Sequence, residues 1–255
     1  MKNRKTIGIV MLISCWTWTL QAQEYKLPKS SGRLEVSISR VTVEGYSGNE
    51  IIFSIVDGPR DKDKRAEGLR AVGGNGLEDN TGLGINVTEK NNVISVRQLK
   101  KMDSPNIRIQ VPKGVIVAYT YESEHQSKVR FKNLENEIEI SAQYNSIELE
   151  NITGPLTAKT IYGHIEADFG NTVKGPISII SVYGFADVTL PVATKADLKL
   201  ATSYGELLVA PEFKIDMGTK GDMVHYSDQI NGKINGGGTS IDITCNYGKV
   251  YLRKK

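Results

Sequence analysis

Hydrophobic and polar residues alternate along most of this chain with a period of two. Such alternation predicts β-strands that bury one face, because successive side chains of a strand point to opposite sides. The pattern runs through 33–56, 85–96 and 107–121, and turn residues at 45–49 and 112–114 interrupt it. No long segment shows helical periodicity. The chain is therefore predicted to be all-β.

From residue 144 onward the alternation becomes a repeat in which a tyrosine separates two short apolar segments. The first three steps between these tyrosines are 18, 21 and 21 residues. The last is 43, which we interpret as two steps with Tyr226 in a poorer copy between them. A fixed period of about 20 residues is typical of solenoids. The clear copies are centred on Tyr144, Tyr162, Tyr183, Tyr204 and Tyr247.

Aligned on the tyrosine, the copies share small or apolar residues two, four and six positions before it and three and five positions after it. This spacing predicts two strands with a common buried face. The residue after each tyrosine tolerates φ > 0, so we expect a sharp corner of that kind between the strands. These corner residues are Asn145, Gly163, Gly184, Gly205 and Gly248.

One copy cannot bury its apolar face alone, so neighbouring copies must stack. Gly-Pro pairs at 154–155 and 175–176 mark a second turn in each copy. We predict a parallel β-solenoid (β-helix) with coils of about 18–22 residues and two or three short strands in each coil.

These motifs resemble a bacterial family. The Gly-Pro strand starts, the Tyr-Gly corners, the segment 190–197 and the ending 247–253 are similar to the β-strand-repeat, adhesin-like family of unknown function, which Gram-negative bacteria secrete. The segments 33–36, 40–45 and 76–82 resemble its N-terminal part. The resemblance implies a secreted β-solenoid. It carries over no catalytic motif.

The first 22 residues have the features of a secretory signal peptide: basic residues at the start, a short apolar core at 7–13 and small residues before a cleavage point after Ala22. The apolar core is too short to span a membrane. An alternative is that 12–15 is a lipobox, which would place a lipid anchor on Cys15. Residues 23–255 are predicted to form one domain, with a less regular part at 23–121 and regular Tyr-Gly repeats at 122–255.

Removal of the signal changes the charge and the composition. The chain has 32 basic and 29 acidic residues, and the signal holds three basic residues and no acid, so the mature form carries 29 of each. This balance argues against nucleic-acid binding. Both tryptophans leave with the signal, and Cys245 then remains as a single cysteine if Cys15 is removed.

An acidic column is the first candidate for chemistry. Glu148, Glu166 and Asp187 each stand four residues after a tyrosine and should point outward in adjacent coils, about 4.8 Å apart. The functional interpretation is a cation site or a platform for a basic ligand, and the alternative is a solvated, ion-paired face. A hard cation needs several oxygens that converge on one point, which a line of carboxylates does not supply.

The tyrosine column and Cys245 have similar alternatives. Tyrosine rings can stack on sugars, but a ladder of rings at a corner is more often structural. Cys245 occupies the same small-residue column as Ala142, Thr160, Ser181 and Thr202, which indicates a buried filler rather than a nucleophile. The histidines have no zinc-ligand spacing. The sequence assigns no catalytic, cofactor-binding or metal residues and predicts no cofactor.

Three functions remain open. The first is a non-catalytic, exported cell-envelope protein, adhesin-like, whose partner is an envelope or extracellular protein or a glycan. It would lie in the periplasm, on the outer membrane surface or outside the cell. The second is a periplasmic accessory protein of envelope sensing or signalling. The third is a polysaccharide-active enzyme of the parallel β-helix type that uses Glu148, Glu166 or Asp187, which would need carboxyl groups with split pKa values.

Overall fold

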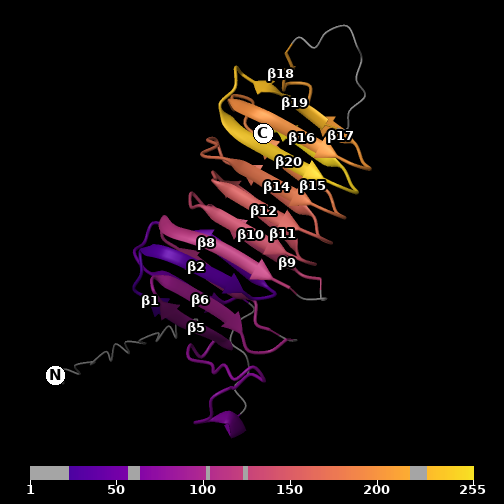
Figure 1. Cartoon of the computed structure of the whole chain (residues 1–255). Helices are drawn as coiled ribbons and strands as arrows, with labels where there is room; N and C mark the ends of the chain where they lie inside the picture. Colours follow the sequence, from indigo (N-terminus) through magenta and orange to yellow (C-terminus); the bar gives the residue numbers. More distant parts are fainter. Residues whose placement is uncertain (1–22, 57–63, 102–103, 123–125, 219–228) are drawn as a thin grey trace, which may run out of the picture.

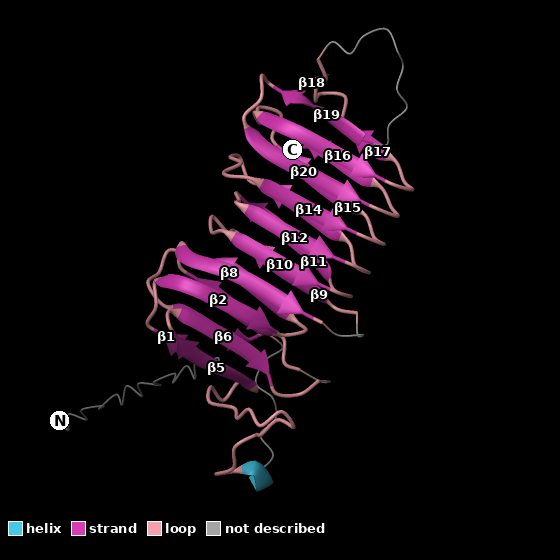
Figure 2. Ribbon diagram, viewed as in Figure 1, coloured by secondary structure: helices cyan, strands magenta, loops and turns pink. Residues whose placement is uncertain are grey.

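The computed structural model describes residues 23–56, 64–101, 104–122, 126–218 and 229–255. The expected signal peptide, Cys15 and Tyr226 lie outside these residues. The prediction of an all-β protein is confirmed: the described part contains 21 strands and one 3₁₀ turn, at Lys64–Ala66, with no α-helix. The strands lie side by side along the length of an elongated molecule (Figures 1 and 2).

The strands form two large sheets. In spatial order, sheet A contains β1 (Glu24–Leu27), β4 (Ile51–Ile55), β7 (Ile107–Val111), β3 (Val41–Gly45), β9 (Lys128–Lys132), β11 (Ser146–Ile152), β13 (Ile165–Phe169), β15 (Ala186–Leu190), β21 (Val250–Lys254) and β17 (Leu207–Val209). Sheet B contains β18 (Ile215–Asp216), β19 (Gln229–Ile234), β16 (Ala196–Thr202), β20 (Thr239–Cys245), β14 (Ile177–Ser181), β12 (Leu156–Thr160), β10 (Ile138–Ala142), β8 (Gly114–Tyr121), β2 (Ser31–Ser37), β6 (Val93–Gln98) and β5 (Ile85–Lys90).

Most of the chain is built from two-strand units, each with a strand in sheet B followed by a strand in sheet A. Every second side chain of these strands is buried, and the inward residues of both sheets form one hydrophobic cluster. The register confirms the predicted columns. Ile138 pairs with Leu156, Leu156 with Ile177, and Ile177 with Ile241, all in parallel strands. Like residues therefore stack on like residues along the length of the core.

The sheets are mixed, so a parallel solenoid throughout is not what the structure contains. The pairs β1–β4, β4–β7 and β5–β6 at one end are antiparallel, as are β16–β19 and β18–β19 at the other. The physical reason is that an antiparallel strand at each end satisfies the backbone groups of the outermost parallel strands; only β5 and β6 are joined by a short hairpin turn.

The last repeat corrects our interpretation of the 43-residue step. The unit formed by β20 and β21 does not follow the unit formed by β16 and β17; it lies between that unit and the one formed by β14 and β15. The chain runs past this position, returns through β19 along β16, and then fills the place between β14 and β16. The segment 210–238 is therefore not an additional copy of the repeat in its described residues.

The N-terminal end has the same arrangement. The first unit, β2 with β3, lies between β6 with β7 and β8 with β9, so an early segment of the chain is also inserted one place inward. The bidentate contact between Arg33 of β2 and Glu139 of β10 bridges across β8, with N–O distances of 2.8 and 2.6 Å. Both ends of the molecule thus join segments that are far apart in sequence.

The Tyr-Gly corners are glycine-rich for a reason other than the one predicted. None of Gly163, Gly184, Gly205 and Gly248 has a positive φ. A Cβ on Gly184 would lie 1.9 Å from the carbonyl oxygen of Gly163, and one on Gly248 would lie 1.9 Å from that of Gly184. The corners stack backbone on backbone, and glycine is needed because there is no room for a side chain. Positive φ occurs instead at Gly154 and Gly175, in the Gly-Pro turns.

Candidate functional site: an exposed tyrosine ladder

The five repeat tyrosines form a continuous stack at the corners between the two sheets. Adjacent ring centroids lie 4.7 Å apart for Tyr144–Tyr162, 5.0 Å for Tyr162–Tyr183, 4.8 Å for Tyr183–Tyr247 and 5.1 Å for Tyr247–Tyr204, with planes within 19° of parallel. The stacking follows the spatial order of the units and not their order in the sequence. The expected ring-on-ring packing is confirmed, and we call these five residues the tyrosine ladder.

The tyrosine ladder is also largely open to solvent. The exposed fractions are 44% for Tyr162, 52% for Tyr183, 51% for Tyr247 and 75% for Tyr204. Large apolar side chains that gather in one exposed strip are unusual on a soluble protein and mark interaction surfaces. The ladder is therefore more than a packing device.

The stacking decides which ligands the tyrosine ladder can accept. A sugar that stacks on tyrosine must lie against a ring face, and the faces between adjacent rings are already occupied by the neighbouring tyrosines at 4.7–5.1 Å. What the ladder offers is a row of ring edges and phenolic hydroxyls. The sugar-stacking interpretation of this column is therefore confined to the outermost rings, Tyr144 and Tyr204.

Buried hydrogen bonds hold the corners in register. In four of the five copies, the small residue two positions before the tyrosine donates to the carbonyl of an adjacent corner: Thr160 Oγ1 to Asn145 O at 3.0 Å, and Ser181 Oγ to Gly163 O at 3.2 Å. Cys245 Sγ to Gly184 O and Thr202 Oγ1 to Gly248 O continue the series at 3.0 and 3.1 Å. Buried carbonyls need such partners, so this column is polar as well as small.

Cys245 belongs to this series and is fully buried, as predicted for a filler. Burial raises the pKa of its thiol, although backbone groups of Gly248 and Ala186 and the Ser181 hydroxyl act in the opposite direction. A thiol with a raised pKa and no access to solvent is a poor nucleophile. Asn145 takes the corner position at the end of the series, where its side chain turns inward and donates to Tyr119 Oη at 2.8 Å.

The acidic column lies on the outer face of sheet A, beside the tyrosine ladder. Glu148, Glu166 and Asp187 are register partners in adjacent strands, as predicted. Two of them are ion-paired. Glu148 contacts Arg130 at 2.9 Å and Lys128 at 3.5 Å, and Arg253 Nε donates to both carboxylate oxygens of Asp187.

The partners of Glu148 set its protonation. Partial burial acts to raise the pKa of this carboxyl, but the hydrogen bond from Arg130 and the charge of Lys128 more than offset it and lower the pKa. No ion pair joins Glu166 to another described residue. The arrangement is that of a solvated, charge-balanced face, and only Glu166 is left to contact a basic group.

A second aromatic row that we did not predict runs from beside the tyrosine ladder into the acidic column, where Tyr251 is the register partner of Asp187. The rings of His164 and Phe185 stack at 4.2 Å, and Phe185 meets Tyr251 edge-on at 6.2 Å. The Arg253 guanidinium lies 5.1 Å from the centre of the Tyr251 ring. His164 and Phe185 each stand two residues after a repeat tyrosine, which is a pattern visible in the sequence. Tyr251 stands four residues after its tyrosine, and only the insertion of the unit formed by β20 and β21 next to β15 brings it beside Phe185.

Within the described residues, no three His, Cys, Asp or Glu side chains gather closely enough to hold a metal ion. His164 is in the aromatic row, and His125 and His225 lie outside the described residues. In the same part of the chain, no helix has the length and hydropathy needed to cross a membrane.

No protein-family model and no curated protein matches the chain. A proposed cell adhesion protein from Clostridium sporogenes ATCC 15579 is similar at 14% identity and a TM-score of 0.43, over 92% of this chain and 100% of that one. A proposed adhesin from Bacteroides fragilis NCTC 9343 is similar at 12% identity and a TM-score of 0.38, over 93% and 98%. Likeness at these TM-scores carries no argument, and the resemblance to the β-strand-repeat family stays a prediction.

Proposed function

We propose that this chain is an exported, non-catalytic binding protein of the cell envelope, adhesin-like, which contacts a protein partner along its tyrosine ladder. The observation that carries the proposal is the row of five stacked tyrosines, four of which are 44–75% exposed. The features of a signal peptide in residues 1–22 support export.

The physics of protein interfaces favours this surface. Tyrosine is enriched in binding sites because its ring offers a large contact area together with a hydroxyl, at a small cost in conformational entropy. In the ladder that entropy is already lost, because each ring is held by its neighbours. The acidic and aromatic rows beside it, with Glu166 and Phe185, extend the surface over the outer face of sheet A.

A hydrolytic role receives less support. Acid catalysis by a carboxyl group needs a raised pKa, whereas Arg130 and Lys128 hold the pKa of Glu148 below its usual range despite partial burial. Asp187 is held by Arg253 in a two-oxygen contact. These contacts support the non-catalytic part of the proposal.

The finer description of the fold is part of the proposal. We infer that the units from β8 to β21 form a parallel, two-sheet β-solenoid whose antiparallel end strands serve as caps. Support comes from the parallel register of β8, β10, β12, β14, β20 and β16 in one sheet and of β9, β11, β13, β15, β21 and β17 in the other.

The experiment that tests the proposed surface compares two charge insertions in purified residues 23–255. Tyr183→Glu places a charge at the middle of the ladder, and Leu69→Glu places one on an exposed apolar residue outside it, 73% exposed. Each variant is immobilised, exposed to solubilised envelope proteins and to surface proteins of other cells, and the bound protein is quantified. We expect loss for Tyr183→Glu alone. Equal retention by both variants, with unchanged melting temperatures, would refute the proposed surface.

Protease shaving of intact cells tests the location. Release of peptides from 144–252 would support a surface adhesin, whereas protection of these peptides beside a digested surface control would favour the periplasmic accessory function. The same preparation, analysed for a diacylglycerol-modified N-terminal peptide, distinguishes lipidation of Cys15 from cleavage after Ala22.

A further inference from the structure

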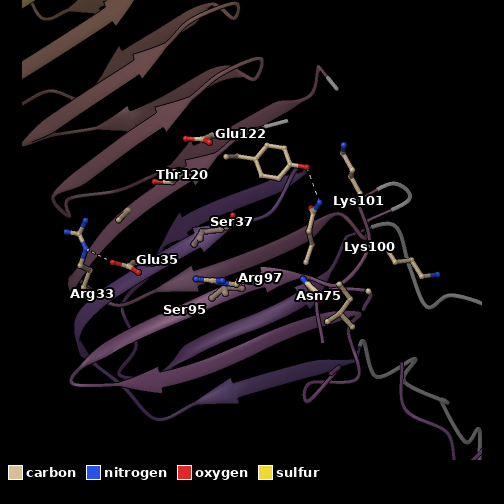
Figure 3. A pocket seen from close by; sticks show the side chains of 17 residues that line it. Arg33, Glu35, Ser37, Asn75, Ser95, Arg97, Lys100, Lys101, Thr120 and Glu122 are labelled. Carbon is tan, nitrogen blue, oxygen red and sulfur yellow. Dashed lines mark hydrogen bonds and ion pairs between the residues drawn. The ribbon is translucent and has the colours of Figure 1, made fainter. Parts of the chain in front are cut away.

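An open groove crosses the outer face of sheet B at the N-terminal end of the molecule, far along the stack from most of the tyrosine ladder. Its volume is about 890 Å³, which lies in the range of small-ligand sites. Strands β8, β2 and β6 form its floor, and the turn at 73–75 with the segment 99–101 borders it (Figure 3). Nothing in the sequence indicated this groove, because it joins four segments that are distant along the chain.

The floor of the groove is polar and hydroxyl-rich. Ser37, Ser95 and Thr120 point outward from three strands, and small side chains at these positions leave the space open. Each hydroxyl can donate and accept a hydrogen bond. The apolar lining residues are all less than a tenth exposed: Val36, Val96, Leu99, Ala118 and Tyr121.

The border of the groove is preformed. Within the turn, Gly76 N donates to Gly73 O at 2.9 Å, Gly73 N to Leu77 O at 2.8 Å, and Leu77 N to Asn75 Oδ1 at 3.1 Å. A Cβ on Gly73 would lie 2.7 Å from the carbonyl oxygen of Leu99, so the turn packs directly against the neighbouring segment. A ligand would not have to order this part of the site.

A hydrogen-bonded glutamine fixes the strand end that carries the central cation. Gln98 Oε1 accepts a hydrogen bond from Ser39 N at 2.8 Å, and its Nε2 donates to Tyr121 Oη at 3.0 Å. Arg97 precedes this residue, and its side chain lies across the middle of the groove (Figure 3). The end of β6 next to Arg97 is therefore held by the segment that follows β2 and by β8.

The charge of the groove is unbalanced. Four cationic and two acidic side chains line it. Arg33 is paired with Glu35 and Glu139 at one end. At the other end and in the middle, Arg97, Lys100 and Lys101 are exposed and make no ion pair with a described residue. Sheet A differs, because its outer cations Lys132, Arg130 and Arg253 all contact acids.

We propose that this groove binds an acidic oligosaccharide, a hydroxyl-rich chain that carries carboxylate or sulfate groups. The three unpaired cations attract the anionic groups, and the hydroxyl floor matches the sugar hydroxyls. A single-stranded nucleic acid needs aromatic faces for its bases, and a peptide needs apolar anchors; the groove exposes neither. The inference goes beyond the proposed protein contact and concerns a different face.

The test uses residues 23–255 and calorimetric titration at low and physiological salt. The probes are trigalacturonic acid, the neutral galactotriose, and a tri-glutamate peptide with the same number of charges. We expect binding of the acidic trisaccharide with a Kd of about 1 mM or tighter, at least about tenfold weaker binding of the peptide, and none of the neutral sugar. No heat of binding by the acidic sugar, or equal binding of the neutral sugar or of the peptide, would overturn the proposal.

Three variants locate the site. The triple variant R97Q/K100Q/K101Q should weaken binding at least about tenfold, a change that corresponds to 1.4 kcal/mol. The matched control K159Q/K195Q/K233Q removes three exposed lysines outside the groove that make no ion pair with a described residue, and it should retain binding. Ser95→Phe fills the floor without changing charge and should also abolish binding. Equal losses in both triple variants, or full binding by a folded Ser95→Phe protein, would overturn the assignment to the groove.

The outcome is independent of the tyrosine ladder. Tyr183→Glu should bind the acidic sugar as the unmodified protein does, and R97Q/K100Q/K101Q should keep the contact of the ladder with its protein partner. If the unmodified protein binds a protein partner but not the acidic sugar, the groove assignment is wrong. If it binds the acidic sugar and Tyr183→Glu still captures the protein partner, the ladder assignment is wrong.

Discussion

Replacement of Gly184 by alanine tests the backbone stacking of the corners. The added Cβ would lie 1.9 Å from the carbonyl oxygen of Gly163, 2.7 Å from its carbonyl carbon and 2.8 Å from His164 Nδ1. An ordinary carbon–oxygen contact is about 3.3 Å, so the two corners must separate by roughly 1.4 Å. The obstacle is main chain on both sides, because Gly248 packs in the same way on Gly184. No rotation of a flexible side chain can relieve the clash.

The magnitude follows from the contacts that this separation breaks. Overpacking of a tight site costs about 1–3 kcal/mol, and the shift also weakens the hydrogen bonds from Cys245 Sγ to Gly184 O and from Tyr183 N to Ile161 O. We expect a loss of about 3 kcal/mol in the free energy of unfolding, or a drop in Tm of roughly 6–12 °C for a domain of this size. Thermal and urea unfolding, followed by circular dichroism, would measure both quantities.

Two other glycines separate crowding from backbone conformation. Gly74 has an ordinary φ and open space around a Cβ, so Gly74→Ala should change stability by less than about 0.5 kcal/mol. Gly76 has equal space but a φ of +80°, so Gly76→Ala should cost about 1–2 kcal/mol. The order of destabilisation should be Gly184, Gly76, Gly74. If Gly184→Ala and Gly74→Ala have the same melting temperature, the steric explanation of the corners is refuted.

Three further predictions follow from the interior and the topology. Thr160→Val removes the buried hydroxyl that donates to Asn145 O and should lower the free energy of unfolding by about 1–3 kcal/mol. Thr157→Val, on the exposed side of the same strand, should leave it nearly unchanged. Equal urea midpoints for the two variants would contradict the role of the small-residue column. Arg33 donates two hydrogen bonds to Glu139 and lowers the pKa of that carboxyl, so the pair stabilises the fold above the unfolded pKa of about 4.3 and loses this effect as the pH falls through the lower folded value. Glu139→Gln should therefore lower the free energy of unfolding by about 0.5–1 kcal/mol at pH 7, a value reduced for solvent exposure, and should have no effect in acid. Urea unfolding at both pH values measures this loss, with Glu137→Gln as the control. The same loss at both pH values would argue against the pair. Deletion of 239–255 should reduce the hydrogen-exchange protection of β14 and of β16, because both strands lose their pairing with β20. Continued protection of both would mean that β14 and β16 pair directly without the inserted unit.

The local pattern predicted a large part of this protein. Period-two alternation identified the strands, and alignment on the tyrosines predicted which side chains share a column, because a parallel register stacks equivalent residues of successive units. Ile140 over Ala158 and Glu148 beside Glu166 are examples that the pairing confirms. The expected turns at 45–49 and 112–114 also separate strands in the structure. These features depend on neighbouring residues alone, so one sequence is enough to predict them.

The order of the units depended on the tertiary structure. A strand of one unit can pair with any unit that presents the same register, and the copies are alike, so nothing local distinguishes Tyr204 from Tyr247 as the neighbour of Tyr183. The insertion of β20 and β21 decided it. The φ of the corner glycines likewise followed from close approach between units rather than from the dipeptide, as the contact between Gly184 and Gly163 O shows.

The two candidate sites differ in how far the sequence predicted them. The tyrosine ladder could be predicted from the sequence, because it is a column of the repeat, but its exposure could not, since that depends on what the rest of the chain covers. The cationic groove could not be predicted from the sequence, because Arg33, Asn75, Arg97 and Thr120 come from four segments with no common motif. Periodicity determines which residues stack, and long-range pairing determines which surfaces remain open.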